Sequence, residues 1–173
     1  MKKEEPFLIS PDVERRFVLH AGKVPAFFLW VDVENQRLYL IKDKRVAEIY
    51  IVSTSKYGVG NIDGSFKTPP GLHRIAEKYG DGAPPKRIFR DRIDTGEDWQ
   101  EGSLEENLVL TRILRLEGLE EGLNRGNGID SFERYIYFHG TNKESLIGSP
   151  FSHGCICMRN GDVIRLYDSV EEG

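Results

Sequence analysis

Apolar residues recur in short segments along the first third of the chain, and most of these segments alternate with polar positions. A period of two over about four to eight residues is typical of strands that bury one face. Polar breaks at residues 34–36 and 42–44 separate the segments. The pattern therefore predicts an antiparallel meander with strands at residues 17–20, 26–33, 37–41 and 46–52.

Long polar segments interrupt the pattern in the middle of the chain. Residues 56–71 are rich in glycine and end in Thr68-Pro69-Pro70-Gly71, which predicts a loop with a rigid exit turn because proline lacks an amide donor. Residues 80–102 combine turn residues with mixed charge and no sustained period, which predicts a surface excursion, either a functional lid or a solvated insertion. Further strands are predicted at residues 72–79, 108–116 and 133–140.

Two segments carry helix signals. Ser103 with Glu106 resembles a capping box, but the β-rich alternation that follows it favours the strand. Near the end of the chain, Asn160 is suited to cap a short helix with Asp162 in its first turn. The apolar face of that helix would consist of Val163, Leu166 and Tyr167.

Length, composition and charge narrow the class of protein. The chain has 173 residues, 39% of them hydrophobic, with a formal net charge of -4. This predicts one domain, residues 1–173, with its own core and no nucleic-acid partner. The apolar segment at residues 24–33 is shorter than the roughly 20 residues that span a bilayer, so no membrane span is expected. Acidic residues and Pro6 follow the basic start, so no export signal is recognised and the chain is expected to be cytoplasmic.

The candidate chemistry gathers in residues 137–158, which hold both cysteines and two of the four histidines. Strand alternation places Tyr135, Tyr137 and His139 on one face of their strand. If residues 155–158 are also extended, Cys155 and Cys157 share a face, while the residues that alternate with them point to the core.

These residues have four possible interpretations. A zinc site is disfavoured because C-x-C is tighter than the usual ligand spacing, and a disulfide within C-x-C would be strained. Packed core histidines and a buried thiol are the default for isolated residues, but here they cluster with glycines between two strand ends. The favoured interpretation is a cysteine nucleophile that a nearby imidazole deprotonates.

Two glycines suit that chemistry. Gly154 lets a substrate carbonyl approach the backbone, where amide groups of Gly154 and Cys155 would hold the oxyanion. Gly140 lets the chain turn after His139 and leaves a backbone carbonyl free to orient the imidazole.

These motifs resemble a known family. His139-Gly140-Thr141, a polar spacer and Ser152-His153-Gly154-Cys155-Ile156 are similar to the signature of the YkuD-type L,D-transpeptidases. Thr68-Pro69-Pro70-Gly71 is similar to the T-P-x-G turn of the family, and Asn160-Gly161-Asp162 with its helix continues the resemblance. It covers most of residues 26–168 and is weakest at residues 80–102.

The resemblance implies a mainly β, sandwich-like fold with mixed sheets and one or two short helices. It also implies cysteine acyl transfer on peptidoglycan stem peptides without a cofactor or metal, and acylation by carbapenem β-lactams. Cys155 would attack the carbonyl of the diaminopimelate-type third residue of a tetrapeptide and release D-alanine. His139 would be the base, with Gly140 orienting it and His153 supporting the site. The residues expected to bind substrate are Tyr137, Ser152 and Arg159.

One departure concerns the substrate site. Cys157 stands where the family often has arginine or asparagine, so the expected substrate-positioning side chain is missing, and Arg159 is the candidate to replace it.

The reaction outcome has alternatives. With no export signal recognised, L,D-carboxypeptidase hydrolysis of free muropeptides in recycling is a close rival to cross-linking. A catalytically silent wall-binding module or a zinc-binding protein is the alternative from another class.

Overall fold

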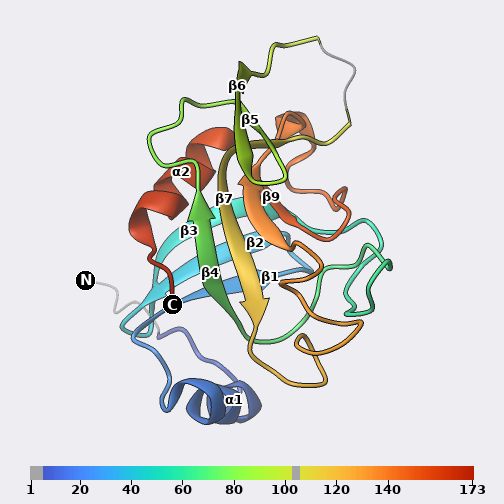
Figure 1. The fold of residues 1–173 in the computed structure, drawn as a ribbon. Helices are drawn as coiled ribbons and strands as arrows, with labels where there is room; N and C mark the ends of the chain where they lie inside the picture. The colour runs from blue at the N-terminus through green and yellow to red at the C-terminus, as the bar shows by residue number, and fades with distance from the viewer. Residues whose placement is uncertain (1–5, 103–105) are drawn as a thin grey trace, which may run out of the picture.

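The structure is a computed structural model that describes residues 6–102 and 106–173, and strands make up most of its regular structure (Figure 1). None of the helices in these ranges is long and apolar enough to cross a membrane. The helices are α1 (Pro11–Ala21), the 3-10 helix η1 (Glu144–Leu146) and α2 (Asn160–Ser169). The strands are β1 (Phe27–Asp32), β2 (Arg37–Lys42), β3 (Arg45–Ser53), β4 (His73–Tyr79), β5 (Arg87–Arg90), β6 (Ile93–Asp98), β7 (Val109–Gly118), β8 (Tyr137–Gly140) and β9 (Ile156–Met158).

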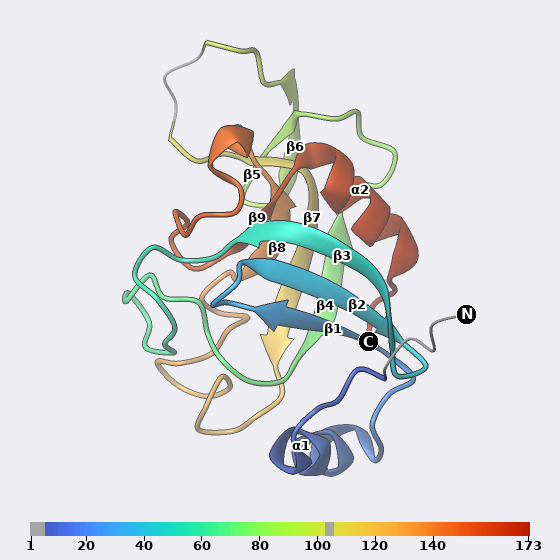
Figure 2. The ribbon, with the colours of Figure 1, turned by 180° about the vertical axis from the view of Figure 1, so that it is seen from behind.

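Within the described ranges the strands form one sheet in the order β1-β2-β3-β9-β8-β7-β5-β6, and β4 also pairs with β7. The pairing is antiparallel except between β8 and β9, which run parallel, so the sheet is mixed. In both views strands β1, β2 and β3 form one layer, and strands β4 and β7 form a second layer that crosses it (Figures 1 and 2). The expected mainly β fold with mixed strand pairing and short helices is confirmed.

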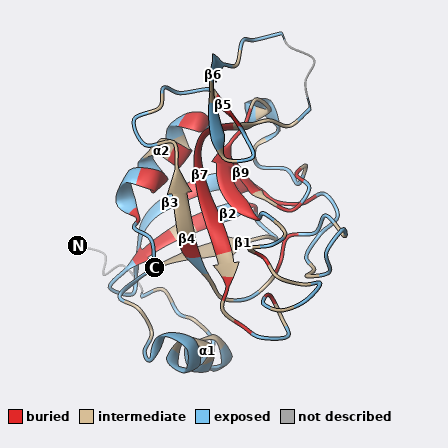
Figure 3. Ribbon diagram, in the orientation of Figure 1, coloured by how far each residue is buried: buried red, intermediate tan, exposed pale blue. Residues whose placement is uncertain are grey.

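The main core lies between these two layers and under α2 (Figure 3). Leu38, Val52, Leu114 and Met158, from β2, β3, β7 and β9, are fully buried. Burying a side chain of this size stabilises the fold by roughly 1.5–3 kcal/mol. The predicted apolar face of α2 is confirmed, because its buried side chains include Val163, Leu166 and Tyr167.

Residues 17–20 were predicted to form a strand, and this prediction is wrong because they lie in α1. The Ser10 hydroxyl accepts a hydrogen bond from the Val13 amide, Pro11 occupies the first turn, and Gly22 ends the helix at φ 75°. These start and stop signals outweigh the short apolar run. The strands predicted at residues 26–33, 37–41 and 46–52 correspond to β1, β2 and β3.

The other predicted elements agree with the structure to different degrees. The strand predicted at residues 133–140 begins only at Tyr137, because Tyr135 has a φ of 56° and cannot continue a strand. Residues 80–102 contain β5 and β6, which form a hairpin that extends the sheet from β7. The strands predicted at residues 72–79 and 108–116 are present as β4 and β7. Ser103 of the suggested capping box lies outside the described residues.

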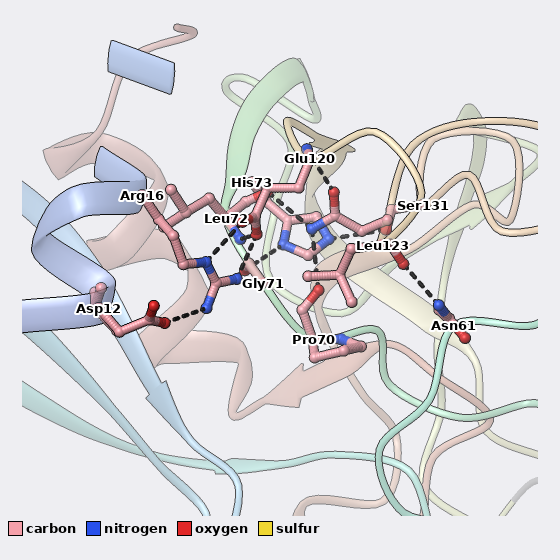
Figure 4. A network of polar contacts seen from close by, with 12 residues as sticks. Asp12, Arg16, Asn61, Pro70, Gly71, Leu72, His73, Glu120, Leu123 and Ser131 are labelled. Atoms are coloured by element: carbon pink, nitrogen blue, oxygen red, sulfur yellow. Dashed lines mark hydrogen bonds and ion pairs between the residues drawn. The ribbon is translucent and has the colours of Figure 1, made fainter. Parts of the chain in front are cut away.

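A polar network fixes the turn at residues 68–72 (Figure 4). Arg16 from α1 donates through Nε to Glu120 at 2.6 Å, and the Leu72 amide donates to the same carboxylate at 2.6 Å. The Asn124 side chain donates to the carbonyls of Pro70 and Leu72. The network therefore ties α1, the start of β4 and the loop after β7 together.

Replacing Glu120 with glutamine should lower the free energy of unfolding at neutral pH by about 1–2 kcal/mol, because the partly buried pair with Arg16 loses its carboxylate charge while Arg16 stays charged. Burial alone would raise the pKa of Glu120, but the hydrogen bonds from Arg16 and Leu72 outweigh it and lower the pKa below 4.5. A lowered folded-state pKa gives stability that is present above the ordinary pKa and lost as pH falls through the folded value.

Denaturant unfolding of wild type and Glu120→Gln at neutral and acidic pH measures this effect. The stability difference should shrink on acidification. Glu121→Gln, at the exposed neighbouring position, is the matched control and should change little. A difference that is equal at both pH values would show that the charge of Glu120 contributes nothing.

Candidate active site

His139 lies in the middle of β8, between β7 and β9, and only 2% of its surface is exposed. Its Nδ1 lies 2.7 Å from the Gly140 carbonyl oxygen, which can only accept a hydrogen bond, so Nδ1 carries the proton. This leaves Nε2 as the acceptor nitrogen. Burial lowers the pKa of His139 to about 4, against the smaller opposing effect of the Gly140 carbonyl. At neutral pH the imidazole is therefore an uncharged base.

The backbone at Gly140 accepts no side chain. A Cβ there would collide with the side-chain oxygen of Asn160 and lie 2.8 Å from the Leu110 carbonyl oxygen. Glycine at this position lets β8 lie close to β7 and α2. The Gly140 carbonyl can then accept the hydrogen bond from His139 Nδ1.

The Nε2 atom of His139 faces Cys157. The two residues are register partners in the parallel β8–β9 pair, and Nε2 lies 3.7 Å from the Cys157 Sγ. The Asn107 side-chain amide donates to the same sulfur at 3.4 Å. Cys157 is fully buried, and burial raises the pKa of its thiol.

Cys155 lies one residue before β9 and retains partly exposed surface. Its thiol donates to the Tyr135 carbonyl oxygen at 3.5 Å, and its side chain packs beside Tyr137. Burial raises the pKa of Cys155 to about 11, although a backbone hydrogen bond at Tyr137 and the charge of Arg134 lower it. No hydrogen bond between Cys155 and His139 occurs within the described residues, so the expected thiol–imidazole contact is not formed in this conformation.

A closed turn carries Cys155. The buried Ser152 hydroxyl donates to the Cys155 carbonyl at 2.6 Å and accepts from the Gly154 amide at 3.2 Å. Thr68 from the proline-rich turn donates to the Gly154 carbonyl at 3.0 Å. Ser152 therefore holds the turn together, and its role in substrate binding stays a prediction. The Gly154 amide, expected to bind an oxyanion, is engaged with Ser152.

The predicted supporting residue, His153, is exposed on the outside of this turn. Its ring packs against Tyr57 and Phe66, with centroids 5.8 and 5.6 Å away. His153 thus belongs to an aromatic cluster on the loop at residues 56–67, separate from the buried contact between His139 and Cys157.

The other two predicted substrate residues occupy different surroundings. Tyr137 is buried, and its hydroxyl accepts from Arg92 at 3.1 Å. Arg92 belongs to the β5–β6 hairpin, which also supplies Phe89 to the hydrophobic cluster around Tyr137. The hairpin therefore borders the Cys155 region, where a lid would lie. Arg159 is exposed at the N-cap of α2, and within residues 6–102 and 106–173 its side chain makes no hydrogen bond to either cysteine or to His139.

Sequence reasoning missed two residues near the thiols. Arg134 donates to the Lys67 carbonyl at 2.6 Å, and its charge favours the thiolate of Cys155. Asn107 reaches Cys157 from the segment that precedes β7. Neither residue belongs to a recognisable motif, because their proximity to the thiols comes from loop packing.

The described residues contain no group of three or more histidine, cysteine or acidic side chains that could hold a metal ion, and both cysteines are free. A hollow of about 880 Å³ is lined mainly by residues of α1, β1 and the segment at residues 68–75. Cys155, Cys157 and His139 do not line it, so the candidate chemistry lies outside this hollow.

Replacing Gly154 with alanine should destabilise the fold by about 1–3 kcal/mol, because Gly154 has a φ of 122° and an added Cβ would lie 3.2 Å from Ile136. Thermal unfolding checks the loss of stability. Gly161→Ala is the matched control, since a Cβ there meets nothing within 4 Å. Equal stability of the two variants would contradict a strained turn at Gly154.

Comparison with solved structures shows a shared fold. An L,D-transpeptidase from Mycobacterium smegmatis is 19% identical with a TM-score of 0.52, and the alignment covers 86% of this chain and 56% of that one. An Enterococcus faecium L,D-transpeptidase mutant is 16% identical with a TM-score of 0.51, covering 86% and 48%. L,D-transpeptidase 3 from Mycobacterium tuberculosis, in complex with a faropenem-derived adduct, is 15% identical with a TM-score of 0.50, covering 86% and 57%. The chain thus spans about half the length of these proteins.

No curated protein matches the sequence significantly. The sequence model of the YkuD family, described as the L,D-transpeptidase catalytic domain, matches residues 26–173. That range includes every strand of the described sheet and both cysteines. The chain therefore belongs to the YkuD family of L,D-transpeptidase catalytic domains.

Proposed function

We propose that this chain transfers the acyl group of a peptidoglycan stem tetrapeptide through a thioester on Cys155 and releases the terminal D-alanine. The observation that carries the proposal is the position of Cys155. It is the partly exposed thiol of the pair, and it lies two positions before Cys157, whose sulfur is 3.7 Å from Nε2 of a buried histidine that donates from Nδ1 to the Gly140 carbonyl. The family of the chain supports the same reaction class.

In the proposed reaction, Cys155 loses its thiol proton to Nε2 of His139 as its sulfur attacks the carbonyl carbon of the third stem residue. The tetrahedral intermediate collapses when the C–N bond to D-alanine breaks and the imidazolium returns its proton to the departing amine. An amine or water then attacks the thioester carbonyl, and His139 accepts the proton of the nucleophile. The C–S bond breaks, and the imidazolium returns its proton to the Cys155 sulfur, which regenerates the resting thiol. Each step conserves atoms and charge without a cofactor.

The resting protonation states favour general-base catalysis over a preformed ion pair. With a pKa of about 11 for Cys155 and about 4 for His139, both groups are neutral at pH 7. Proton transfer must therefore accompany attack on the substrate. Catalytic hydrogen bonds are often long or misaligned without substrate and tighten in the complex, so the resting orientation of Cys155 toward Tyr135 is compatible with this role.

Intact-mass measurement after exposure to imipenem tests the nucleophile. A β-lactam adduct is expected on wild type, in keeping with the faropenem-derived adduct on the Mycobacterium tuberculosis neighbour. Cys155→Ala should give no adduct, and His139→Gln should slow acylation by about 100- to 10,000-fold because the base is lost. Cys157→Ser should still form the adduct. An adduct that survives on Cys155→Ala would overturn the assignment.

Incubation with a free tetrapeptide, with and without D-methionine, separates transfer from hydrolysis. Transferase activity should give a tetrapeptide that carries D-methionine in its last position, because an amine captures the thioester. Tripeptide as the only product in both reactions would instead identify an L,D-carboxypeptidase. Chromatography with mass detection distinguishes these products, and Cys155→Ala provides the blank.

A further inference from the structure

A directional chain of hydrogen bonds ends at the candidate base. Thr141 donates from its hydroxyl to Asn107 Oδ1 at 2.6 Å, and Asn107 donates from Nδ2 to Cys157 Sγ at 3.4 Å. Cys157 Sγ lies 3.7 Å from His139 Nε2, and His139 donates from Nδ1 to the Gly140 carbonyl. The Cys157 sulfur accepts from Asn107, and Nε2 of His139 carries no proton because Nδ1 does. The Cys157 thiol proton must therefore point to Nε2.

The surroundings keep this contact uncharged. Thr141 and Cys157 are fully buried, and His139 is 2% exposed. Burial raises the pKa of the thiol and lowers that of the imidazole, so an ion pair between Cys157 and His139 is disfavoured. The contact is therefore a hydrogen bond from a neutral thiol to a neutral imidazole.

The charged and titratable groups on neighbouring elements are engaged elsewhere. On β7, the Arg112 guanidinium donates to the carbonyls of Ala83 and Thr111. Glu144 of η1 accepts from Asn160 at the start of α2. Cys155, just before β9, donates to Tyr135. This leaves Cys157 as the titratable side chain in contact with Nε2 within the described residues.

We propose that Cys157 is a positioning residue for His139: its thiol donates to Nε2, holds the imidazole as the neutral Nδ1-protonated tautomer, and occupies the acceptor nitrogen until substrate engages Cys155. The proposal deepens the proposed function and rests on it for the role of His139 as base. It assigns Cys157 neither to substrate binding nor to nucleophilic attack, because the side chain has no exposed surface.

The consequence for His139 has a definite sign. A hydrogen bond donated to the neutral form of a base stabilises that form and lowers its pKa. Removing the donor should therefore raise the pKa of His139 and weaken its tautomer preference. Serine keeps a hydrogen-bond donor at the same position. Alanine and valine both lack a donor, and their side chains are smaller and larger, respectively, than that of cysteine.

Nitrogen NMR of the His139 ring during a pH titration tests the proposal in the substrate-free protein. Wild type and Cys157→Ser should show the Nδ1-protonated tautomer and a pKa well below 6.5. Cys157→Ala and Cys157→Val should both show a larger share of the Nε2-protonated tautomer than wild type, although the Gly140 carbonyl still favours a proton on Nδ1. Both should also show a pKa raised by at least about half a unit, roughly a threefold change in the protonation constant. Thermal unfolding establishes that each variant is folded. If only one of the two apolar variants folds, that variant is sufficient for the comparison with Cys157→Ser.

An unchanged His139 pKa and tautomer in a folded apolar variant would overturn the proposal. The proposal would also fail if the His139 pKa in Cys157→Ser rose as far as in the apolar variants. Packing, and not the hydrogen-bond donor, would then account for the change in pKa. The pH dependence of imipenem acylation should move in the same direction as the NMR titration, with its acid limb at higher pH in Cys157→Ala. If wild type is not acylated at all, the proposed function fails, while the NMR result still decides the role of Cys157.

Discussion

The parallel pairing of β8 with β9 is the constraint on which the candidate site depends. It sets His139 opposite Cys157 and leaves Cys155 just outside the strand, where its side chain reaches partly exposed surface. Parallel neighbours need a long connection. Here that connection contains η1 and the closed turn at residues 152–155, so the same topology that buries His139 also supplies the loop that carries Cys155.

The burial of His139 follows from this arrangement and sets its protonation state. His139 lies in the interior of the sheet, where a charged imidazole is costly, and its pKa falls to about 4. Cys155 is more accessible, but its thiol is also disfavoured as an anion. Both groups are therefore uncharged at neutral pH in the resting state.

The sequence predicted the strands better than the contacts between their side chains. Alternation correctly placed Ile156 and Met158 in the core, because strand periodicity determines which face a side chain occupies. Periodicity does not determine register between strands. The alignment of His139 with Cys157 was therefore not predictable. The closure of the Ser152 hydroxyl within its own turn and the approach of Asn107 likewise depend on loop packing.

A shift of the acceptor nitrogen from Cys157 to Cys155 would give up the contact between His139 and Cys157. The two cysteines are two positions apart, with Cys155 directly before β9 and Cys157 in the middle of that strand. The hydrogen bond given up is a single neutral one, which contributes on the order of 1 kcal/mol. Substrate binding supplies several times that amount even at a dissociation constant of about 1 mM, which corresponds to roughly 4 kcal/mol. A resting contact of this strength can hold the base in one tautomer without blocking its use.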